Sequence, residues 1–516
     1  MRTRDRREFL ADVGRVMLLS SAGPALAADL GLASARAADA PEALHFGKLE
    51  PLVSLMQETP AAKLVPVVVG QLKNGVDLRT LVAAGALANA RTFGGQDYIG
   101  FHTFMALPPA LEIARSLPTE KQALPVIKVL YRNTDRIQQE GGRSKEVLHP
   151  VHVHAETTPS NAPGGEALQA AVRRTDWNGA EQTFANLAAG SVADAFNALQ
   201  AIVEDEVDVH RVVLAWRAWA MLPIAGQEQA HTVLRQSVRY CLDQEENLKK
   251  NKHKPSEIRS VLPKLLDQYR LMGREPGKRT ADDAWVAHLS DTIFAGTREQ
   301  AADAVANALA EGMATEAVGE AISLAANMLV LRDPGRPQAY ANKPVGSVHG
   351  DSVGVHASDS ANAWRNIARV SNPRNTFASL IVGAYHTAGQ AGRSNKHPYP
   401  WAEHRAQATA TNAAELLHLT DEAIRAKEQA RASALAERYC EQGHAARPLL
   451  NLLREFAISE DGALHAEKYY RTVEEEYSTT RAAFRNRQLV ALARVTASEF
   501  GYPAPGYADA CRLLGV

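Results

Sequence analysis

The chain is poor in cysteine and in net charge, and it lacks long apolar runs. Three cysteines among 516 residues, far apart in the sequence, cannot form a disulfide framework or a close-spaced zinc site, although a single disulfide is possible. A formal net charge of -1 gives no electrostatic basis for binding nucleic acid or an anionic membrane. No apolar run approaches the roughly 20 residues that span a bilayer, so no permanent membrane anchor is expected. The 46% of hydrophobic residues can still bury a large core.

Several familiar catalytic motifs are also missing. The sequence has no Gly-x-x-x-x-Gly-Lys-Ser/Thr loop, no dinucleotide fingerprint, no Gly-x-Ser-x-Gly elbow, no His-Glu-x-x-His motif and no Cys-x-x-Cys-His site. Classical nucleotide hydrolases, serine hydrolases, zincins and c-type cytochromes are therefore excluded. Any chemistry must come from another arrangement of side chains.

The N-terminus carries a pattern typical of export. Arg6 and Arg7 stand directly before a polar residue, Phe9 and Leu10, and a moderately apolar stretch follows from Val13 to Ala28. This resembles the twin-arginine class of bacterial signal, which implies the twin-arginine export machinery as a partner. We expect residues 1–38 to be a signal peptide and the mature protein to be periplasmic or extracellular. The alternative is an amphipathic N-terminal helix.

Residues 39–516 are expected to form a single all-α domain. Stretches of 10 to 20 residues rich in Ala, Leu and Arg recur along the chain, as in Ala106 to Leu117 and Val192 to Ile202. Strand-like alternation is confined to His149 to Ala155. No segment has the composition of a flexible interdomain linker.

One short pattern recurs along the chain. It consists of Asp, any residue, Ile or Val, Gly or Asp, an apolar residue and His. The strict copies are Asp97–His102, Asp205–His210 and Asp351–His356, and looser copies end at His288 and His465. Such recurrence is the signature of repeated helical hairpins, which stack into an α-solenoid or close into an α/α-toroid-like domain. Equivalent positions then lie on one face or around one axis, so the histidines could converge.

The position of His within each copy favours a neutral imidazole. If the Asp caps a helix, its carboxylate accepts a backbone N–H of the first turn. The apolar residue three before the His then shares its face, which turns the imidazole toward the interior. The positive end of the helix dipole also opposes protonation. Neutral imidazole is the form that binds a metal or accepts a proton.

Convergent neutral histidines predict a transition-metal site. Iron, copper, manganese or zinc would suit three or more imidazoles, and the nearby Asp side chains could act as outer partners. The expected ligands are His102, His210, His356, His288 and His465. The sequence thus predicts a metal-dependent enzyme, an oxidoreductase, acting on a small-molecule substrate.

Tyrosines follow the three strict copies at a nearly constant distance. Tyr131 lies 29 residues after its His, Tyr240 lies 30 after, and Tyr385 lies 29 after. These three are the candidate catalytic residues, as acids or hydrogen-bond donors to a substrate oxygen. Two alternatives remain: a metal-free hydrolase or lyase that uses His and Tyr, and a non-enzymatic helical-repeat binding protein with structural histidines.

His-bearing segments that open successive hairpins give the chain a family resemblance. The segments Gly100-Phe101-His102-Thr103 and Gly354-Val355-His356-Ala357 resemble the questin oxidase-like family in this hairpin pattern. That family is associated with oxidative ring cleavage of aromatic polyketides. The resemblance implies an oxidative role and transfers no catalytic residue.

Overall fold

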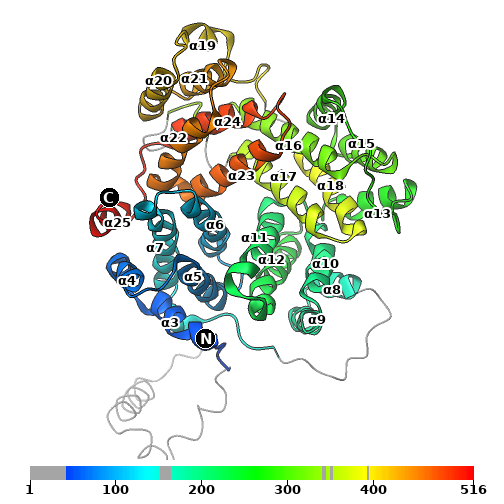
Figure 1. Cartoon of the computed structure of the whole chain (residues 1–516). Coiled ribbons are helices and arrows are strands. Elements are labelled where there is room, and N and C mark those ends of the chain that lie inside the picture. Colours follow the sequence, from blue (N-terminus) through cyan, green and yellow to red (C-terminus); the bar gives the residue numbers. More distant parts are fainter. Residues whose placement is uncertain (1–41, 152–163, 340–343, 349–351, 392–393) are drawn as a thin grey trace, which may run out of the picture. The chain divides into compact units, whose positions relative to one another are not determined.

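The fold is entirely helical throughout the part of the chain that the structure describes. The structure is a computed structural model that describes residues 42–151, 164–339, 344–348, 352–391 and 394–516. The chain divides into two compact units, Met1–His45 and Phe46–Val516. In the second unit the described residues form 23 α-helices, α3 to α25, and no strand, which confirms the all-α prediction (Figure 1).

The helices fall into four groups that are consecutive along the chain, and within each group the helices pack against one another, though not always in chain order. The first group contains α3 (Glu50–Glu58), α4 (Ala61–Lys73), α5 (Leu78–Phe93), α6 (Tyr98–Arg115) and α7 (Ala123–Gln139). The second contains α8 (Gly164–Arg174), α9 (Trp177–Ala188), α10 (Val192–Val203), α11 (Val209–Ala225) and α12 (Ala230–Lys250).

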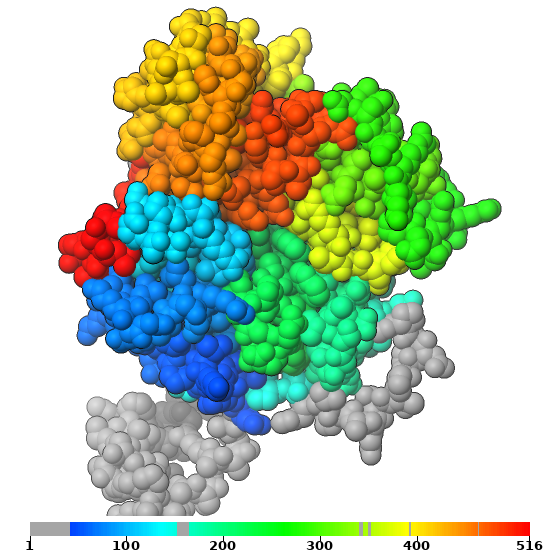
Figure 2. Space-filling model, viewed as in Figure 1, coloured from blue at the N-terminus to red at the C-terminus, as the bar shows by residue number. Residues whose placement is uncertain are grey.

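The remaining groups are built in the same way. The third contains α13 (Ile258–Gln268), α14 (Asp283–Ala295), α15 (Arg298–Ala310), α16 (Thr315–Leu331), α17 (Val353–Val370) and α18 (Pro373–Ala388). The fourth contains α19 (Ala402–Gln407), α20 (Ala413–Arg425), α21 (Gln429–Glu441), α22 (Ala446–Ser459), α23 (Ala466–Thr479) and α24 (Asn486–Glu499), and α25 (Tyr507–Leu514) follows. Figure 2 shows the four groups in sequence order around one face of this unit.

One helix from each group contributes to an inner ring. Helix α6 contacts α11, α11 contacts α17, α17 contacts α23, and α23 returns to α6. Each inner helix also packs against a partner from its own group, namely α7, α12, α18 and α24. The four therefore form a closed cycle, as expected of a toroid-like stack of hairpins rather than an open solenoid (Figure 1).

A buried lysine joins the first group to the last. The Lys128 ammonium on α7 donates to the carbonyls of Ala457 (2.9 Å) and Glu460 (2.6 Å) and to the Glu467 carboxylate (2.7 Å). The side chains of Lys128 and Glu467 are each 1% exposed. Helix α25 also packs on α4 and α7. The ends of the unit are thus held together by polar contacts as well as apolar packing.

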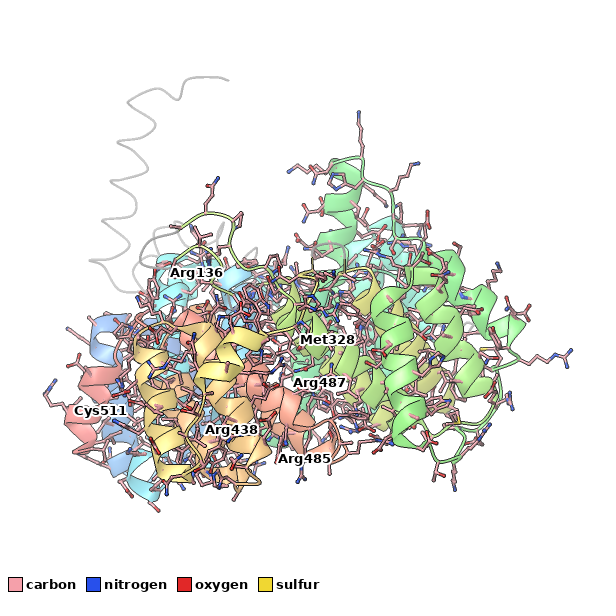
Figure 3. All side chains as sticks on the ribbon, turned by 90° about the horizontal axis from the view of Figure 1, so that it is seen from above. Arg136, Met328, Arg438, Arg485, Arg487 and Cys511 are labelled. Atoms are coloured by element: carbon pink, nitrogen blue, oxygen red, sulfur yellow. The ribbon has the colours of Figure 1, made fainter. Side chains whose placement is uncertain are left out.

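The seam between the third and fourth groups is polar too. On α16, Asn327 donates to the carbonyl of Arg487 and to the Gln488 side chain at 3.3 and 3.0 Å. Arg487 donates back to the carbonyl of Leu324 at 3.3 Å. Figure 3 labels Arg487 and Met328 on the two sides of this seam. These bonds fix α24 against α16 and so set the position of α23.

The repeated Gly has a packing role. A Cβ on Gly100 would lie 2.5 Å from the Phe93 ring, and one on Gly354 would lie 2.7 Å from the backbone of Val330. Only glycine lets these helix starts approach their neighbours so closely. In the first and third copies the glycine therefore allows the close approach of an inner helix to the helix before it, whereas the second copy has Asp208 at this position.

Two further properties of the described residues bear on the sequence predictions. The cysteines Cys241, Cys440 and Cys511 are all free. None of the described helices combines the length and the apolar character needed to cross a bilayer. Of the predicted strand, His149 to Val151 is irregular, and the rest lies outside the described residues.

Candidate metal centre

Four histidines meet where the inner helices begin. His102 is in the second turn of α6, His210 and His356 are in the first turns of α11 and α17, and His465 immediately precedes α23. Around the cycle, successive ring centroids are 4.8 Å (102 to 210), 5.5 Å (210 to 356), 5.2 Å (356 to 465) and 5.2 Å (465 to 102) apart. The four imidazoles therefore form a closed ring at the ends of the four inner helices. We name it the histidine ring.

Two of these imidazoles present an unsatisfied nitrogen. His102 Nδ1 is 2.7 Å from the carbonyl of Tyr98, so Nδ1 carries the proton and Nε2 has the lone pair. Nε2 of His102 and Nε2 of His210 are both buried without a hydrogen-bond partner among the described residues. A buried polar atom without a partner costs free energy, so these two atoms require a functional explanation.

His210 is oriented by a carboxylate. Asp208 Oδ1 lies 3.4 Å from His210 Nδ1, and Asp208 Oδ2 accepts a hydrogen bond from the Tyr240 hydroxyl at 2.5 Å. Although burial opposes it, bonding to His210 and Tyr240 lowers the pKa of Asp208 well below its usual range. Burial and the neighbouring Asp208 raise the pKa of Tyr240. The chain Tyr240–Asp208–His210 therefore holds a carboxylate against the ring.

The capping prediction holds for one copy of the repeat and is wrong for another. Asp97 caps α6 by accepting from Gly100 N at 2.6 Å. In the second copy Asp208, not Asp205, caps the helix, because Asp205 is bonded to Arg173 at 2.6 Å. In the third copy Ser352 is the cap, and Asp351 lies outside the described residues.

The predicted shared face is also wrong in two copies. Val353, three residues before His356, is 53% exposed, and Val207 lies before α11 begins. The imidazoles face inward because the inner helices close into a cycle. Local helix periodicity does not determine their direction.

Burial keeps the imidazoles of His102 and His356 neutral. Burial, together with the nearby Lys468 and His210, holds the pKa of His102 far below its usual value. Burial and His210 lower the pKa of His356 to about 3. These two imidazoles are therefore neutral at neutral pH, each with one unprotonated ring nitrogen, as the sequence predicts.

A second layer of buried charge lies one helical turn beyond the ring. Lys468 follows His465 by three residues on α23, and Asp359 follows His356 by three on α17. Both are nearly inaccessible, and Thr472 donates to Asp359 Oδ1 at 2.8 Å. Burial lowers the pKa of Lys468 to about 8 and raises that of Asp359. Sequence patterns did not reveal this pair, because neither residue belongs to the repeat.

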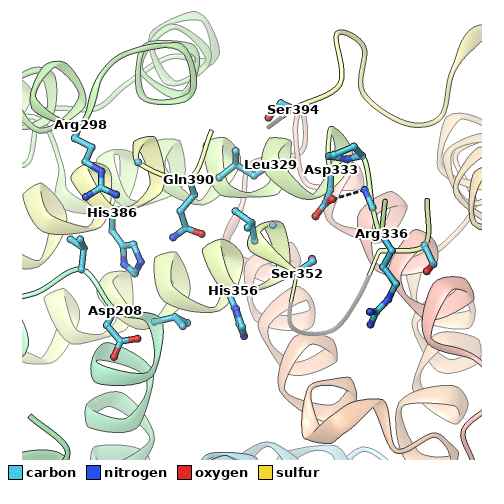
Figure 4. Close-up of a pocket in the computed structure, with 18 residues that line it drawn as sticks. Asp208, Arg298, Leu329, Asp333, Arg336, Ser352, His356, His386, Gln390 and Ser394 are labelled. Carbon is cyan, nitrogen blue, oxygen red and sulfur yellow. Dashed lines mark hydrogen bonds between the residues drawn. The ribbon is translucent and has the colours of Figure 1, made fainter. Parts of the chain in front are cut away.

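A cavity opens beside the ring. It has a volume of about 790 Å³, which is the size of a small-molecule site. The lining side chains that carry chemistry are Asp208, His356, His386, Arg298, Gln390 and Asp333 (Figure 4). The aromatic rings of Tyr98 and Phe101 contact His102 at centroid distances of 4.4 and 4.9 Å. One ring member is thus open to a ligand while another is covered by aromatic side chains.

The structure places the other predicted site residues differently. Tyr385 is buried on α18 beneath Arg298, beside the cavity. Tyr131, on α7, packs against Gly506 and the C-terminal segment, away from the ring. His288 is exposed on α14, which is not one of the four inner helices, so it does not join His102, His210, His356 and His465. Of the three tyrosines, only Tyr240 is connected to a ring histidine.

The spacing of the ring can be compared with that of a metal centre. As they stand, no three His, Cys, Asp or Glu side chains within the described ranges are arranged to hold a metal ion. A coordinating imidazole has its nitrogen about 2.0–2.1 Å from the ion and its centroid about 1.1 Å further away. Two such rings at roughly 90–110° have centroids about 4.5–5.2 Å apart. The observed spacings of 4.8–5.5 Å overlap the upper part of this range and extend slightly beyond it.

Acid is expected to destabilise the metal-free protein through its buried histidines. The pKa of His356 is about 3 and that of His386 about 4, mainly because of burial, against about 6.5 in the unfolded chain. Between these values the unfolded state binds more protons, so the free energy of unfolding falls as the pH falls. Each group contributes about 1.4 kcal/mol per pH unit.

Urea unfolding between pH 7.5 and 4.5 measures this slope. The His386→Gln variant should show a smaller slope than the wild type, and His418→Gln, at a 71% exposed side chain, should not. Equal slopes in the wild type and His386→Gln would contradict the expectation.

Comparison with known proteins adds no relative. No family model matches the chain, and neither a curated protein nor a solved structure matches it. The class that fold and site define is an all-α, toroid-like helical-repeat protein with a ring of four histidines.

Proposed function

We propose that this chain is a metal-dependent enzyme, an oxidoreductase, whose centre is formed by His102, His210, His356 and His465. The observation that carries the proposal is the histidine ring itself. Four imidazoles from four separate repeats meet, two of them with buried and unsatisfied Nε2 atoms, at the edge of a cavity of about 790 Å³. Purely structural histidines would be expected to have both ring nitrogens hydrogen-bonded.

The surrounding residues suit this role. The Tyr98 carbonyl fixes the tautomer of His102, and Asp208 faces Nδ1 of His210, as outer partners of metal-bound histidines do. Nε2 of His356 and Nε2 of His465 are 3.2 Å apart, which would correspond to an angle of roughly 100–105° at an ion about 2.0–2.1 Å from each. Iron, copper, manganese or zinc would suit such neutral nitrogen ligands.

The division of tasks follows from this geometry. A transition metal bound there would supply Lewis acidity and, for iron, copper or manganese, electron transfer. The protein's own residues would keep the imidazoles neutral, orient them and admit a small-molecule substrate past His356. Asp208 and Tyr240 would hold a proton next to His210. This proposal retains the predicted oxidative role and four of the five predicted metal ligands, and of the three predicted catalytic tyrosines it retains Tyr240.

Metal analysis of the purified protein tests the proposal. We expect about one transition-metal ion per chain, removable by a chelator and restored by adding the metal back. Optical and paramagnetic resonance spectra before and after dithionite treatment then test the redox part. Bound zinc, or spectra that do not change on treatment with dithionite, would contradict the proposal of an oxidoreductase. Either result would still be consistent with a metal centre. Protein that neither contains nor takes up a metal would contradict both.

The alternative is a non-enzymatic helical-repeat binding protein. It is favoured by the His356–His465 contact and by the absence, in the described residues as they stand, of three side chains arranged to ligate. In that case the histidines would be structural and the cavity would hold a ligand without chemistry. The same metal analysis separates the two candidates.

We also propose export by the twin-arginine route, which rests on residues that the structure does not describe. Changing both Arg6 and Arg7 to Lys keeps the charge and removes the paired guanidinium groups. We expect the variant to accumulate in the cytoplasm as uncleaved precursor, while the wild type appears in the periplasm or medium. Fractionation and blotting measure this, with Arg15→Lys as the matched control. Unimpaired export of the double variant would contradict the route.

A further inference from the structure

Arg298 is a cation on the cavity wall, and no acidic side chain within the described residues pairs with it. It is the first residue of α15, and its guanidinium lies over the Tyr385 ring, 5.4 Å from the centroid. The guanidinium has no hydrogen-bond or ion-pair partner among the described residues. A guanidinium is always charged and presents donors in a planar fork that matches a carboxylate. Its position suggests a ligand as the missing partner.

Gly389 makes the space that this guanidinium fills. A Cβ at position 389 would lie 2.1 Å from Nε and 2.6 Å from Cζ of Arg298. The backbone of Gly389, with φ -66° and ψ -10°, is ordinary helical geometry that any residue adopts. The backbone conformation at position 389 therefore does not require glycine. The close approach of the Arg298 side chain does require it, because a Cβ would occupy the same space. The end of α18 thus provides the space, which we call the seat, that the Arg298 guanidinium occupies.

Polar side chains continue from Arg298 toward the histidine ring. Figure 4 shows Arg298, His386 and Asp208 in succession along one wall, with the Gln390 amide facing the same space. His386 is 5% exposed, and its Nδ1 is buried without a hydrogen-bond partner in the described residues. Asp208, at the opposite end of this row, would repel an anion. The row is therefore polarised, with its cationic end at Arg298.

We propose that the cavity binds a small organic molecule with a single carboxylate, held by Arg298 in the seat that Gly389 provides. One guanidinium without an acidic partner balances one negative charge. The rest of the molecule extends past His386 toward His356 and the histidine ring. This names the substrate class of the proposed enzyme and rests on that function for the reaction, whereas the binding itself needs no metal.

Matched acids and amides test the proposal on metal-free protein. Calorimetric titration with benzoate against benzamide, and hexanoate against hexanamide, isolates the charge at constant shape. We expect the wild type to prefer the carboxylates and Arg298→Gln to lose about 10- to 100-fold in carboxylate affinity, the effect of a charge-assisted hydrogen bond. Equal binding of acids and amides, no binding of either, or unchanged affinity in Arg298→Gln would overturn the proposal.

A glycine substitution provides a second, independent test. Gly389→Ala should displace the guanidinium and weaken carboxylate binding in the same direction, and adding it to Arg298→Gln should have little further effect. Gly70→Ala, whose Cβ would meet nothing within 4 Å, is the matched control. A preference for benzoate in a protein that neither contains nor takes up a metal would support the carboxylate site and contradict the metal centre. Full metal content without that preference would overturn the carboxylate site alone.

Discussion

Loss of His102 is expected to abolish metal binding with little loss of fold. In His102→Ala we expect metal affinity to fall by more than the roughly 10- to 100-fold that the loss of an outer partner costs. The reason is that Nε2 of His102 is buried, oriented by the Tyr98 carbonyl and without another partner in the described residues. Competition with a chromogenic chelator measures the affinity, and circular dichroism checks the fold.

Graded controls make this result interpretable. Asp208→Asn keeps the ring but weakens its outer partner, so a loss of about 10- to 100-fold is expected. His288→Ala changes an exposed histidine away from the ring and should leave metal content unchanged. Full metal content in His102→Ala, His210→Ala and His356→Ala alike would refute the metal centre. Large losses of stability in a protein that never binds metal would instead favour structural histidines.

Opening the polar junction between the first and last groups is expected to produce the largest loss of stability. Lys128→Met removes three hydrogen bonds and leaves the Glu467 carboxylate buried without its lysine. Breaking one side of a buried pair costs about 3–5 kcal/mol. Urea denaturation measures the free energy of unfolding, and metal binding should weaken in parallel, because Glu467 lies two residues from His465.

Two controls separate charge burial from packing at this junction. In the double variant Lys128→Met with Glu467→Leu, no lone charge remains buried, so we expect most of the stability to return. Lys121→Met breaks a pair with Glu455 at 3.5 Å whose side chains are 39% and 45% exposed, and it should cost no more than about 1 kcal/mol. Equal losses of stability in Lys121→Met and Lys128→Met would contradict the idea that the buried pair of Lys128 and Glu467 holds the first and last groups together.

The sequence predicted the fold class because the relevant signals are local. Helical periodicity, glycine and proline breaks and the recurrence of one pattern ending in His depend on neighbouring residues, and they indicated repeated hairpins. The capping residue was less secure, because several carboxylates compete within a few positions. Asp205 fits the pattern, but Arg173 on another helix binds it, and Asp208 caps α11 instead.

The site was only partly predictable for the same reason. Four of the five predicted metal ligands meet in the structure, and His288 does not, since the pattern around it also suits an exposed helix start. Residues outside the repeat, such as Arg298 and Lys468, have no distinguishing local signal. Their roles depend on helices distant in the chain, as when Gly389 leaves room for Arg298.

The amino-acid sequence by itself determined an all-α repeat with histidines at equivalent places, because helix formation and repetition are encoded over short distances. Only the tertiary structure decided which of those histidines face one another, because that depends on how α23 returns to α6. The closure is made by packing and by buried bonds such as Lys128 to Glu467, between residues more than 300 positions apart.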